Sequence, residues 1–384
     1  MKWKRAKISE VCQGIYDGPH ATPSVSEEGA VFLGISNITP DGHLDLSSPK
    51  YIGEKDLPKW TKRVTPQEGD IVFSYEATLN LYAIIPKGFR GCLGRRMALI
   101  RPDEEKVLGK FLYYYFFSDE WRGMIAENTV IGATVDRIPL IRFPNFPVSF
   151  PPVEKQRLIM SVLSAYDDLI ENNQKQIKLL EEAAQRLYKE WFVDLRFPGH
   201  ENTKITDGIP EGWRRGALAD VATFKRGKTI TKEQTNPGVV PVVAGGLEPA
   251  YFHDTFNTGA PVITVSGSGA NAGFTRMYHT KVWASDCSYV DSVATENLAW
   301  VYCFLKENNT KIETMQKGAA QPHVYAKDIN ALEAVIPNDK QMKRFQAIAE
   351  PMFARIGTLE TQKARLREAC NCLLPKLMNG EIEV

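Results

Sequence analysis

The chain is poor in the residues that build metal sites and disulfide scaffolds. Its 384 residues include six cysteines, at positions 12, 92, 287, 303, 370 and 372. No two of them form the Cys-x-x-Cys pair that is typical of zinc sites. The six histidines, at positions 20, 43, 200, 253, 279 and 323, show no metal-ligand spacing either. We therefore expect a cytoplasmic protein with reduced cysteines and no metal site.

Long apolar segments and a strong net charge are also missing. The most apolar stretch, Phe111–Phe117, is far too short to span a bilayer. The N-terminal segment from Met1 to Ile15 includes basic side chains but no apolar core of a signal peptide. The net charge is +1, whereas a strong non-specific nucleic-acid binder is usually more basic. The overall charge therefore neither favours nor excludes a DNA-binding protein.

The motifs that would point to a catalytic centre lack the right spacing. Gly267–Gly273 follows an expected strand, as a phosphate-binding loop does, but it reads Gly-x-Gly-x-x-x-Gly and no clear helix follows. Pro102–Lys106 places acids beside a lysine, as in a nuclease centre, but these charges are adjacent instead of separated by a strand. The Asn-Pro-Pro-Tyr-like motif of amino-methyltransferases is absent. Without a nucleophile, a base and an orienting group, we expect no catalytic residues in this chain.

The sequence contains an internal repeat. Trp3–Val11 and Trp213–Val221 share a Trp, a basic residue, an aliphatic residue, an acid and a Val at equivalent positions. Further along, Gly132-Ala133 recurs as Gly318-Ala319, and Pro151 recurs as Pro337. The offset between the two halves is smaller at these later positions than at the two Trp residues. The segment between the matching positions is therefore longer in the first half than in the second. Such a repeat predicts two domains of similar plan.

Each half has the pattern of an α+β domain. Short β-rich runs occur at Ile71–Tyr75 and Val262–Val265, and the segments 111–125 and 298–315 have the apolar spacing of helices. Between the halves, residues 196–212 are rich in Pro, Gly and polar side chains, as a surface linker is.

The clearest pattern is a heptad repeat that follows each domain. Apolar residues alternate at spacings of four and three, with one polar exception in each series. The first series is Ile159, Leu163, Tyr166, Ile170, Asn173, Ile177, Leu180, Ala184, Leu187 and Trp191. The second series, at the offset that relates Pro151 to Pro337, is Phe345, Ala349, Met352, Ile356, Leu359, Lys363, Leu366, Cys370, Leu373 and Leu377. This period predicts a coiled-coil pair; the alternative is two amphipathic helices, each packed on its own domain.

The two polar exceptions favour an antiparallel pair. A parallel pair with matched ends would place Asn173 against Leu359 and Ile177 against Lys363, which leaves both polar groups facing apolar partners. An antiparallel pair with matched centres brings together residues whose numbers sum to 536, so Asn173 faces Lys363. We therefore predict antiparallel helices whose register is set by these two residues. Pro351 removes one backbone hydrogen bond near the start of the second helix, where we expect a kink.

The remaining polar features are suited to binding DNA. Lys62 and Arg63 lie near Trp60, and Arg95 and Arg96 follow a glycine-rich turn. Arg and Lys neutralise phosphates, Arg can bond to guanine through two parallel hydrogen bonds, and Asn or Gln can read adenine in the same way. The candidate DNA-contacting residues are Lys62, Arg63, Asn80, Arg95, Arg96, Lys225, Arg226, Lys228, Asn271, Arg276, Gln321 and His323. The alternative for each cluster is a solvated face without a binding role.

Several segments together resemble the specificity subunit of type I restriction–modification systems. They follow the order expected for that family and cover nearly the whole chain. The segments are Gly18–Pro23, Phe150–Gln156, Ile209–Trp213, Gly318–His323 and Leu373–Ile382. The main departure from the family pattern is Pro351 in the second helix.

The resemblance implies two α/β target recognition domains, each followed by a long helix, with the helices packed as an antiparallel coiled coil. The boundaries we expect are 1–150 for the first recognition domain, 151–195 for the first spacer helix, 196–212 for the linker, 213–336 for the second recognition domain and 337–380 for the second spacer helix. Recognition domains held apart by the long spacer helices would contact DNA at two separate places. We therefore predict a bipartite DNA target with an unread gap between its two parts.

The resemblance also implies partners. Two methyltransferase subunits would bind the spacer helices and supply chemistry based on S-adenosylmethionine, and two restriction subunits would add ATP- and magnesium-dependent translocation and cleavage. This chain would need no cofactor and would select the DNA. Two alternatives stay open: a stand-alone DNA-modifying enzyme or its recognition region, and a scaffold with no DNA role.

Overall fold

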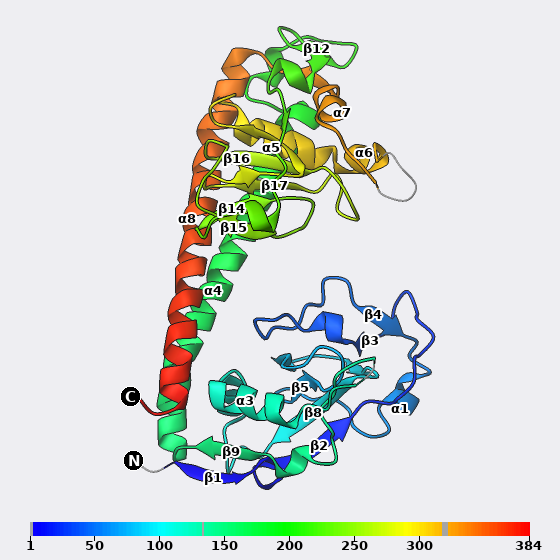
Figure 1. The fold of residues 1–384 in the computed structure, drawn as a ribbon. Coiled ribbons are helices and arrows are strands. Elements are labelled where there is room, and N and C mark those ends of the chain that lie inside the picture. Colours follow the sequence, from blue (N-terminus) through cyan, green and yellow to red (C-terminus); the bar gives the residue numbers. More distant parts are fainter. Residues whose placement is uncertain (1–2, 133, 317–321) are drawn as a thin grey trace. The chain divides into compact units, whose positions relative to one another are not determined.

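The computed structural model describes residues 3–132, 134–316 and 322–384. The chain forms two compact units, of which unit 1 comprises Met1–Leu169 with Leu366–Val384, and unit 2 comprises Ile170–Arg365. Two long helices, α4 (Val153–Tyr188) and α8 (Asp339–Met378), contribute residues to both units. Figure 1 shows each unit as a set of strands and short helices beside these helices.

Unit 1 contains two sheets and a two-stranded ribbon. The strand order is β2-β8-β5-β6 in the first sheet and β4-β3-β7 in the second, and β1 pairs with β9. The strands are β1 (Lys4–Lys7), β2 (Cys12–Asp17), β3 (Ala30–Leu33), β4 (Lys50–Ile52), β5 (Ile71–Ser74), β6 (Tyr82–Ile84), β7 (Gly91–Leu93), β8 (Met97–Pro102) and β9 (Pro147–Phe150). The short helices are α1 (Leu57–Trp60), α2 (Gly109–Tyr115) and α3 (Asp119–Asn128).

Unit 2 repeats this plan. Its sheets have the orders β13-β19-β16-β17 and β15-β14-β18, β12 pairs with β20, and β10 pairs with β11. The strands are β10 (Ile205–Thr206), β11 (Ile209–Pro210), β12 (Arg214–Ala217), β13 (Lys225–Arg226), β14 (Val240–Val243), β15 (Tyr251–His253), β16 (Val262–Ser266), β17 (Thr275–Tyr278), β18 (Trp283–Ala284), β19 (Cys287–Asp291) and β20 (Glu333–Ile336). The short helices are α5 (Leu298–Glu307), α6 (Asn309–Thr314) and α7 (Ala326–Asn330).

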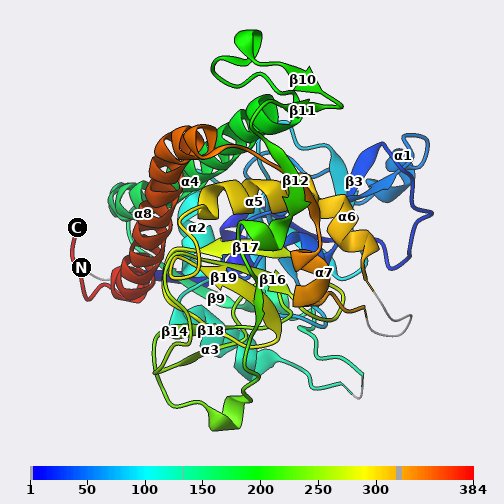
Figure 2. The same ribbon diagram turned by 90° about the horizontal axis from the view of Figure 1, so that it is seen from above.

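The matching strand orders confirm the α+β fold with two domains of one plan that the internal repeat predicts. The equivalence extends to strand direction, because β3 with β7 and β14 with β18 are parallel whereas the other ladders are antiparallel. The β10–β11 hairpin lies in the expected linker, and Figure 2 shows it standing away from the β16–β17 sheet of unit 2.

One of the two inner strands of each larger sheet, β5 in unit 1 and β16 in unit 2, is buried along its whole length. All four residues of β5 and all five of β16 are buried, which agrees with their apolar, β-branched sequences. The segments expected as single helices are each divided into two. In unit 1, Ser118 accepts a hydrogen bond from the Trp121 amide at 3.3 Å and begins α3 as its N-cap. In unit 2, the Asn308 side chain bonds to the Phe304 carbonyl at 2.9 Å and ends α5.

The long helices run antiparallel within each unit. In unit 2, the rings of Trp191 and Phe345 lie 6.1 Å apart, so the late part of the first helical segment packs on the early part of α8. In unit 1, Lys155 Nζ lies 3.8 Å from Glu383 Oε1, so the early part of α4 lies beside the chain end that follows α8. The predicted antiparallel pairing is therefore confirmed. One π-helical turn, Lys189–Val193, extends α4.

α8 continues without interruption through Pro351 and Pro375. The first spacer helix was expected to reach residue 195 and the second residue 380, and the observed helical segments end at Val193 and Met378. No described helix combines the length and the apolar character that a membrane crossing requires.

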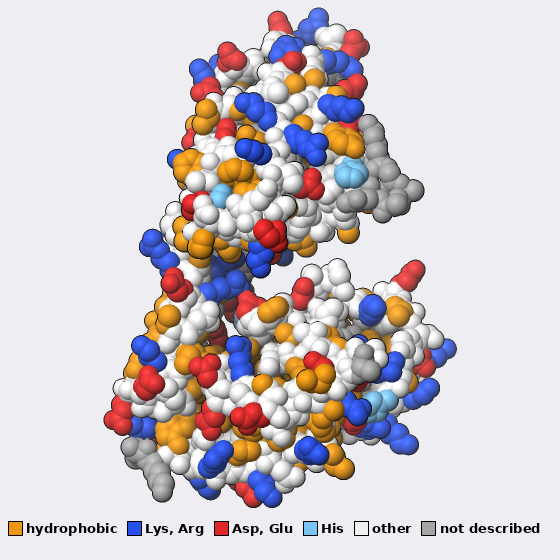
Figure 3. Space-filling view, viewed as in Figure 1, with side chains coloured by type: hydrophobic (Ala, Val, Ile, Leu, Met, Phe, Trp, Pro, Cys, Tyr) orange, Lys and Arg blue, Asp and Glu red, His pale blue; other side chains and the backbone are white. Residues whose placement is uncertain are grey.

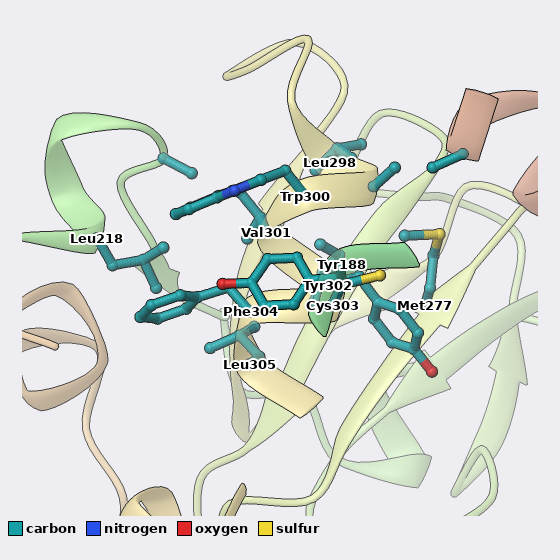
Figure 4. Close-up of a cluster of buried hydrophobic side chains, with 14 of the residues drawn as sticks. Tyr188, Leu218, Met277, Leu298, Trp300, Val301, Tyr302, Cys303, Phe304 and Leu305 are labelled. Carbon is teal, nitrogen blue, oxygen red and sulfur yellow. The ribbon is translucent and has the colours of Figure 1, made fainter. Parts of the chain in front are cut away.

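Aromatic packing anchors the sheets and short helices of unit 2 to its long helices. Tyr188 at the end of α4 lies 6.0 Å, centroid to centroid, from Trp300 of α5, and Trp300 stacks on Phe304 at 5.2 Å (Figure 4). All three side chains are buried. Burial of large aromatic side chains contributes strongly to such contacts, so the sheets of unit 2 are held firmly on its part of the helix pair.

Candidate nucleic-acid interface

The loops at one end of the larger sheet in unit 1 form a compact group. We call residues 17–20, 75–81, 94–96, 130–132 and 134–138 the first loop edge. At the end of β2, the Gly18 amide donates to the Met97 carbonyl at 2.9 Å. A Cβ at position 18 would lie 2.3 Å from the Gly94 carbonyl oxygen, so only glycine permits this close approach of the two chain segments.

Backbone hydrogen bonds join the other segments of the first loop edge. The Tyr75 amide donates to the Arg96 carbonyl at 3.2 Å, and the Tyr75 carbonyl accepts from the Ile138 amide at 2.8 Å. The Tyr75 hydroxyl donates to the Arg95 carbonyl at 3.2 Å. Burial raises the pKa of Tyr75 to about 12, so this hydroxyl stays a hydrogen-bond donor well above neutral pH.

Unit 2 forms the same arrangement with different residues. We call residues 227–228, 267–274, 285–286 and 322–324 the second loop edge. The Gly227 amide donates to the Cys287 carbonyl at 2.8 Å, the Gly267 amide to the Asp286 carbonyl at 3.1 Å, and the Val324 amide to the Gly267 carbonyl at 3.1 Å. These three bonds match those made by Gly18, Tyr75 and Ile138, so the two edges are equivalent.

Most of the candidates predicted in the first half lie at the first loop edge. Arg95 is exposed at the tip of its turn, and Arg96 Nε lies 3.9 Å from Glu76 Oε1. The Arg63 guanidinium reaches the edge from outside by bonding to Asp17 Oδ1 and to the Gly18 carbonyl at 3.4 Å. The exposed Lys62 directly precedes it, and Asn80, at a φ of 60°, accepts from the Tyr82 hydroxyl at 3.3 Å.

The candidates of the second half are divided among three places. Lys225 and Arg226 are exposed on β13, next to the second loop edge, and Lys228 lies in the edge, where its amide donates to the Ala284 carbonyl at 2.9 Å. Asn271 and His323 also belong to this edge, and the ring of His323 stacks on Tyr325 at 5.9 Å. Gln321 lies outside the described residues.

Arg276 lies on β17 and is tied to a neighbouring loop. Its guanidinium donates to the Leu247 carbonyl at 2.9 Å and to Glu248 Oε2 at 3.2 Å, and it lies 4.9 Å from the ring centroid of Tyr278. These internal contacts occupy N–H groups of Arg276 that could otherwise donate hydrogen bonds to a base or a phosphate. Whether it contacts DNA stays a prediction.

The register residues lie in the helix pair of unit 2. Asn173 is buried, and the Lys363 ammonium donates to the side-chain oxygen of Gln174, the residue after Asn173. A direct contact between Asn173 and Lys363 stays a prediction.

Sequence reasoning missed several polar residues at the edges. These are Asp17, Glu76, Arg137, Ser268 and Asp286. Their only signal in the sequence is a position just after a strand or in a turn, and many other polar residues share that position. The contacts between segments that bring them together cannot be read without the strand order.

The edges are suited to contact a polar polymer. Figure 3 shows basic and acidic side chains interspersed on the displayed face of each unit, with no field of one sign. Exposed Lys and Arg near each edge can neutralise phosphates, while donors and acceptors on rigid turns can bond to base edges. Among the described residues, no group of three or more His, Cys, Asp or Glu side chains could hold a metal ion.

Comparisons with known proteins agree with this arrangement. A family model described as the type I restriction modification DNA specificity domain matches residues 2–182 and again 210–368. The chain is 25% identical to the specificity subunit of the type I restriction enzyme MjaIX from Methanocaldococcus jannaschii over 90% of this chain and 86% of the relative. It is 22% identical to the HindI specificity subunit from Haemophilus influenzae over 99% of each chain.

A solved structure has a similar fold. The crystal structure of the type I restriction–modification S subunit from M. genitalium matches with a TM-score of 0.58 at 18% identity, covering 98% of this chain and 96% of that one. The family model covers most of the chain, in two matches that fall one on each repeat of the sequence. The chain therefore belongs to the family of type I restriction–modification DNA specificity domains.

Proposed function

We propose that this chain selects the DNA sequence on which a type I restriction–modification complex acts. Each loop edge would read one half of a two-part target. The observation that carries this proposal is the duplicated edge, in which the same three backbone hydrogen bonds present different side chains in units 1 and 2. A shared backbone with different side chains is what two separate base-reading surfaces require.

The gap between the half-sites would depend on α4 and α8. α4 has 36 residues, which corresponds to about 54 Å at a rise of ~1.5 Å per residue. Since both helices contribute residues to both units, we propose that their length sets the number of unread base pairs. One turn of B-DNA spans about 34–36 Å.

The chemistry would belong to partner subunits. We propose that two methyltransferase subunits bind the helix region and use S-adenosylmethionine, and that two restriction subunits use ATP and magnesium. The chain itself would act as a non-catalytic subunit.

The test uses the full chain with and without a methyltransferase partner. Adenine or cytosine methylation in a host genome is sequenced with the gene intact and deleted, and the purified chain alone is assayed for methylation, cleavage and S-adenosylmethionine binding. We expect two constant half-sites separated by unread bases, and no turnover by the isolated chain. A continuous target, or catalysis by the chain alone, would contradict the proposal.

A further inference from the structure

Three positions at the first loop edge have structural counterparts at the second. Arg96 corresponds to Asp286, because the carbonyl of each accepts a hydrogen bond from the amide that directly follows an inner strand. In unit 1 this is the amide of Tyr75 after β5, at 3.2 Å, and in unit 2 it is the amide of Gly267 after β16, at 3.1 Å. Glu76 therefore corresponds to Ser268, the next residue along each chain.

The third position is fixed by a backbone bridge. Glu76 pairs with Arg137 in an isolated antiparallel bridge, and Ser268 pairs with His323 in the same way. Arg137 and His323 are also related by the offset of the internal repeat that relates Gly132 to Gly318. We call Glu76, Arg96 and Arg137 the first triplet, and Ser268, Asp286 and His323 the second triplet.

The chemistry of the two triplets is different although their backbones correspond. The first triplet combines an acid with two guanidinium groups, and Arg96 and Glu76 approach each other to 3.9 Å. In the second triplet the hydroxyl of Ser268 donates to the carboxylate of Asp286. The position that carries a donor in unit 1 therefore carries an acceptor in unit 2.

The side chains are not required to hold these turns. The backbone bonds of Tyr75 and Gly267, and the amides of Gly94 and Ser285 that donate at 2.7 and 2.8 Å to the Leu33 and Val243 carbonyls, already hold each turn in place. The Arg96 side chain is 38% exposed and remains accessible to a ligand. Rigid turns with accessible, exchangeable side chains are typical of specificity-determining positions.

We propose that the two triplets determine the base preference of the two half-sites, an inference that rests on the proposed function. Arg96 donates two hydrogen bonds to O6 and N7 of a guanine in the first half-site. Asp286, oriented by Ser268, accepts a hydrogen bond from the N4 amino group of a cytosine in the second half-site. Adenine fits Asp286 less well, because its N7 acceptor lies beside its amino group and would face the carboxylate.

The test selects bound duplexes from a random library with the full chain in its complex. Asp286→Asn replaces one acceptor by a donor at constant size. We expect the cytosine preference at one position of the second half-site to fall by about 5- to 150-fold, the range for one good base contact. The first half-site stays unchanged. Arg96→Gln should lower the guanine preference at one position of the first half-site and leave the second half-site unchanged.

Two matched control variants replace a carboxylate and a guanidinium group by an amide outside the loop edges. Glu333→Gln on β20 and Arg5→Gln on β1 change exposed residues of the two-stranded ribbons, which belong to neither loop edge. Both should select the wild-type target. If Asp286→Asn abolishes all binding, Ser268→Ala removes only the hydroxyl that orients Asp286, and it should weaken the same cytosine preference while the other positions are kept.

The outcomes separate the two proposals. Unchanged half-sites in the Asp286 and Arg96 variants, or an unchanged cytosine preference in Ser268→Ala, would overturn the assignment of the triplets. The proposed function would stand in that case, because the wild-type chain still selects a two-part target. If the wild-type complex selects no sequence, the proposed function itself fails.

Discussion

The ammonium group of Lys363 on α8 donates a hydrogen bond to the side-chain amide oxygen of Gln174 on α4. Gln174 directly follows the buried Asn173 in the sequence. Lys363, the polar exception of the second heptad series, therefore bonds to the neighbour of Asn173, the polar exception of the first series. A polar layer inside an apolar seam fixes register at a cost in stability. Replacing the residues of this layer by apolar ones therefore measures its cost in free energy of unfolding.

We predict that replacing the layer by leucine stabilises the chain. The double variant Asn173→Leu, Lys363→Leu exchanges polar groups in the seam for apolar ones, and its free energy of unfolding should rise by about 1 kcal/mol. Urea denaturation followed by circular dichroism measures the change. Lys175→Leu, an exposed position on the same helix, serves as the control and should leave the midpoint unchanged. A double variant that unfolds at lower urea would show that the polar layer stabilises the pair.

A second prediction concerns a glycine in the middle of α8. A Cβ at Gly357 would lie 2.6 Å from both Cβ and Cγ of His279, which follows β17 in unit 2. Gly357→Ala should therefore destabilise the protein by about 1–3 kcal/mol through overpacking, although alanine favours helices. Gly123→Ala in α3 is the matched control, because no atom lies within 4 Å of its added Cβ, and it should be neutral or stabilising by up to ~1 kcal/mol. Equal effects of the two substitutions would contradict the packing argument.

The same contact predicts a pH dependence of stability. Burial lowers the pKa of His279 from its ordinary value of 6.5 to about 4. Between these values the unfolded chain binds a proton at this residue that the folded chain does not, so the folded state loses stability as the pH falls from 6.5 towards 4. Thermal melting across this range should show a smaller decline for His279→Gln than for the wild type. Parallel curves for the two proteins would exclude a contribution from this histidine.

The sequence predicted the arrangement of the chain better than its site. The repeat of Trp3–Val11 at Trp213–Val221 and the two heptad series predicted two domains of one plan and an antiparallel helix pair. Periodic patterns of this kind report local geometry and burial, which depend on neighbouring residues in the sequence. The breaks at Ser118 and Asn308 were missed, because the apolar spacing continues across both and only the hydrogen bonds of these side chains reveal them.

The site was only partly predictable for a different reason. Arg95, Arg96 and His323 were selected from their residue types, and they lie at the loop edges. Asp286 and Glu76 were not selected, because an acid in a short turn is ordinary in any sequence. Their correspondence with Arg96 and Ser268 depends on the strand orders β2-β8-β5-β6 and β13-β19-β16-β17, which pair segments far apart in the chain. Long-range pairing of this kind leaves no periodic signal in the sequence.

A fourth prediction concerns phosphate contacts near the second loop edge. Lys225 and Arg226 are both exposed on β13. Replacing either by alanine should weaken binding to all DNA sequences alike and lower the slope of log affinity against log salt by about one. Fluorescence anisotropy with a target duplex and a scrambled duplex at several salt concentrations measures both effects. Lys178→Ala, whose side chain is 77% exposed on α4, is the control; native affinity and slope in the β13 variants would identify these residues as a solvated face.

The central claim is that two loop edges read two half-sites whose gap depends on the helix pair. The most direct test inserts one heptad into α4 between residues 169 and 170 and one into α8 between residues 366 and 367. These two insertion points lie opposite each other in the antiparallel register and preserve the seam. One heptad adds about 10 Å of helix, so sequencing of methylated sites should show both half-sites unchanged and the gap about three base pairs longer at ~3.4 Å each. An active complex that keeps the original gap would contradict the claim.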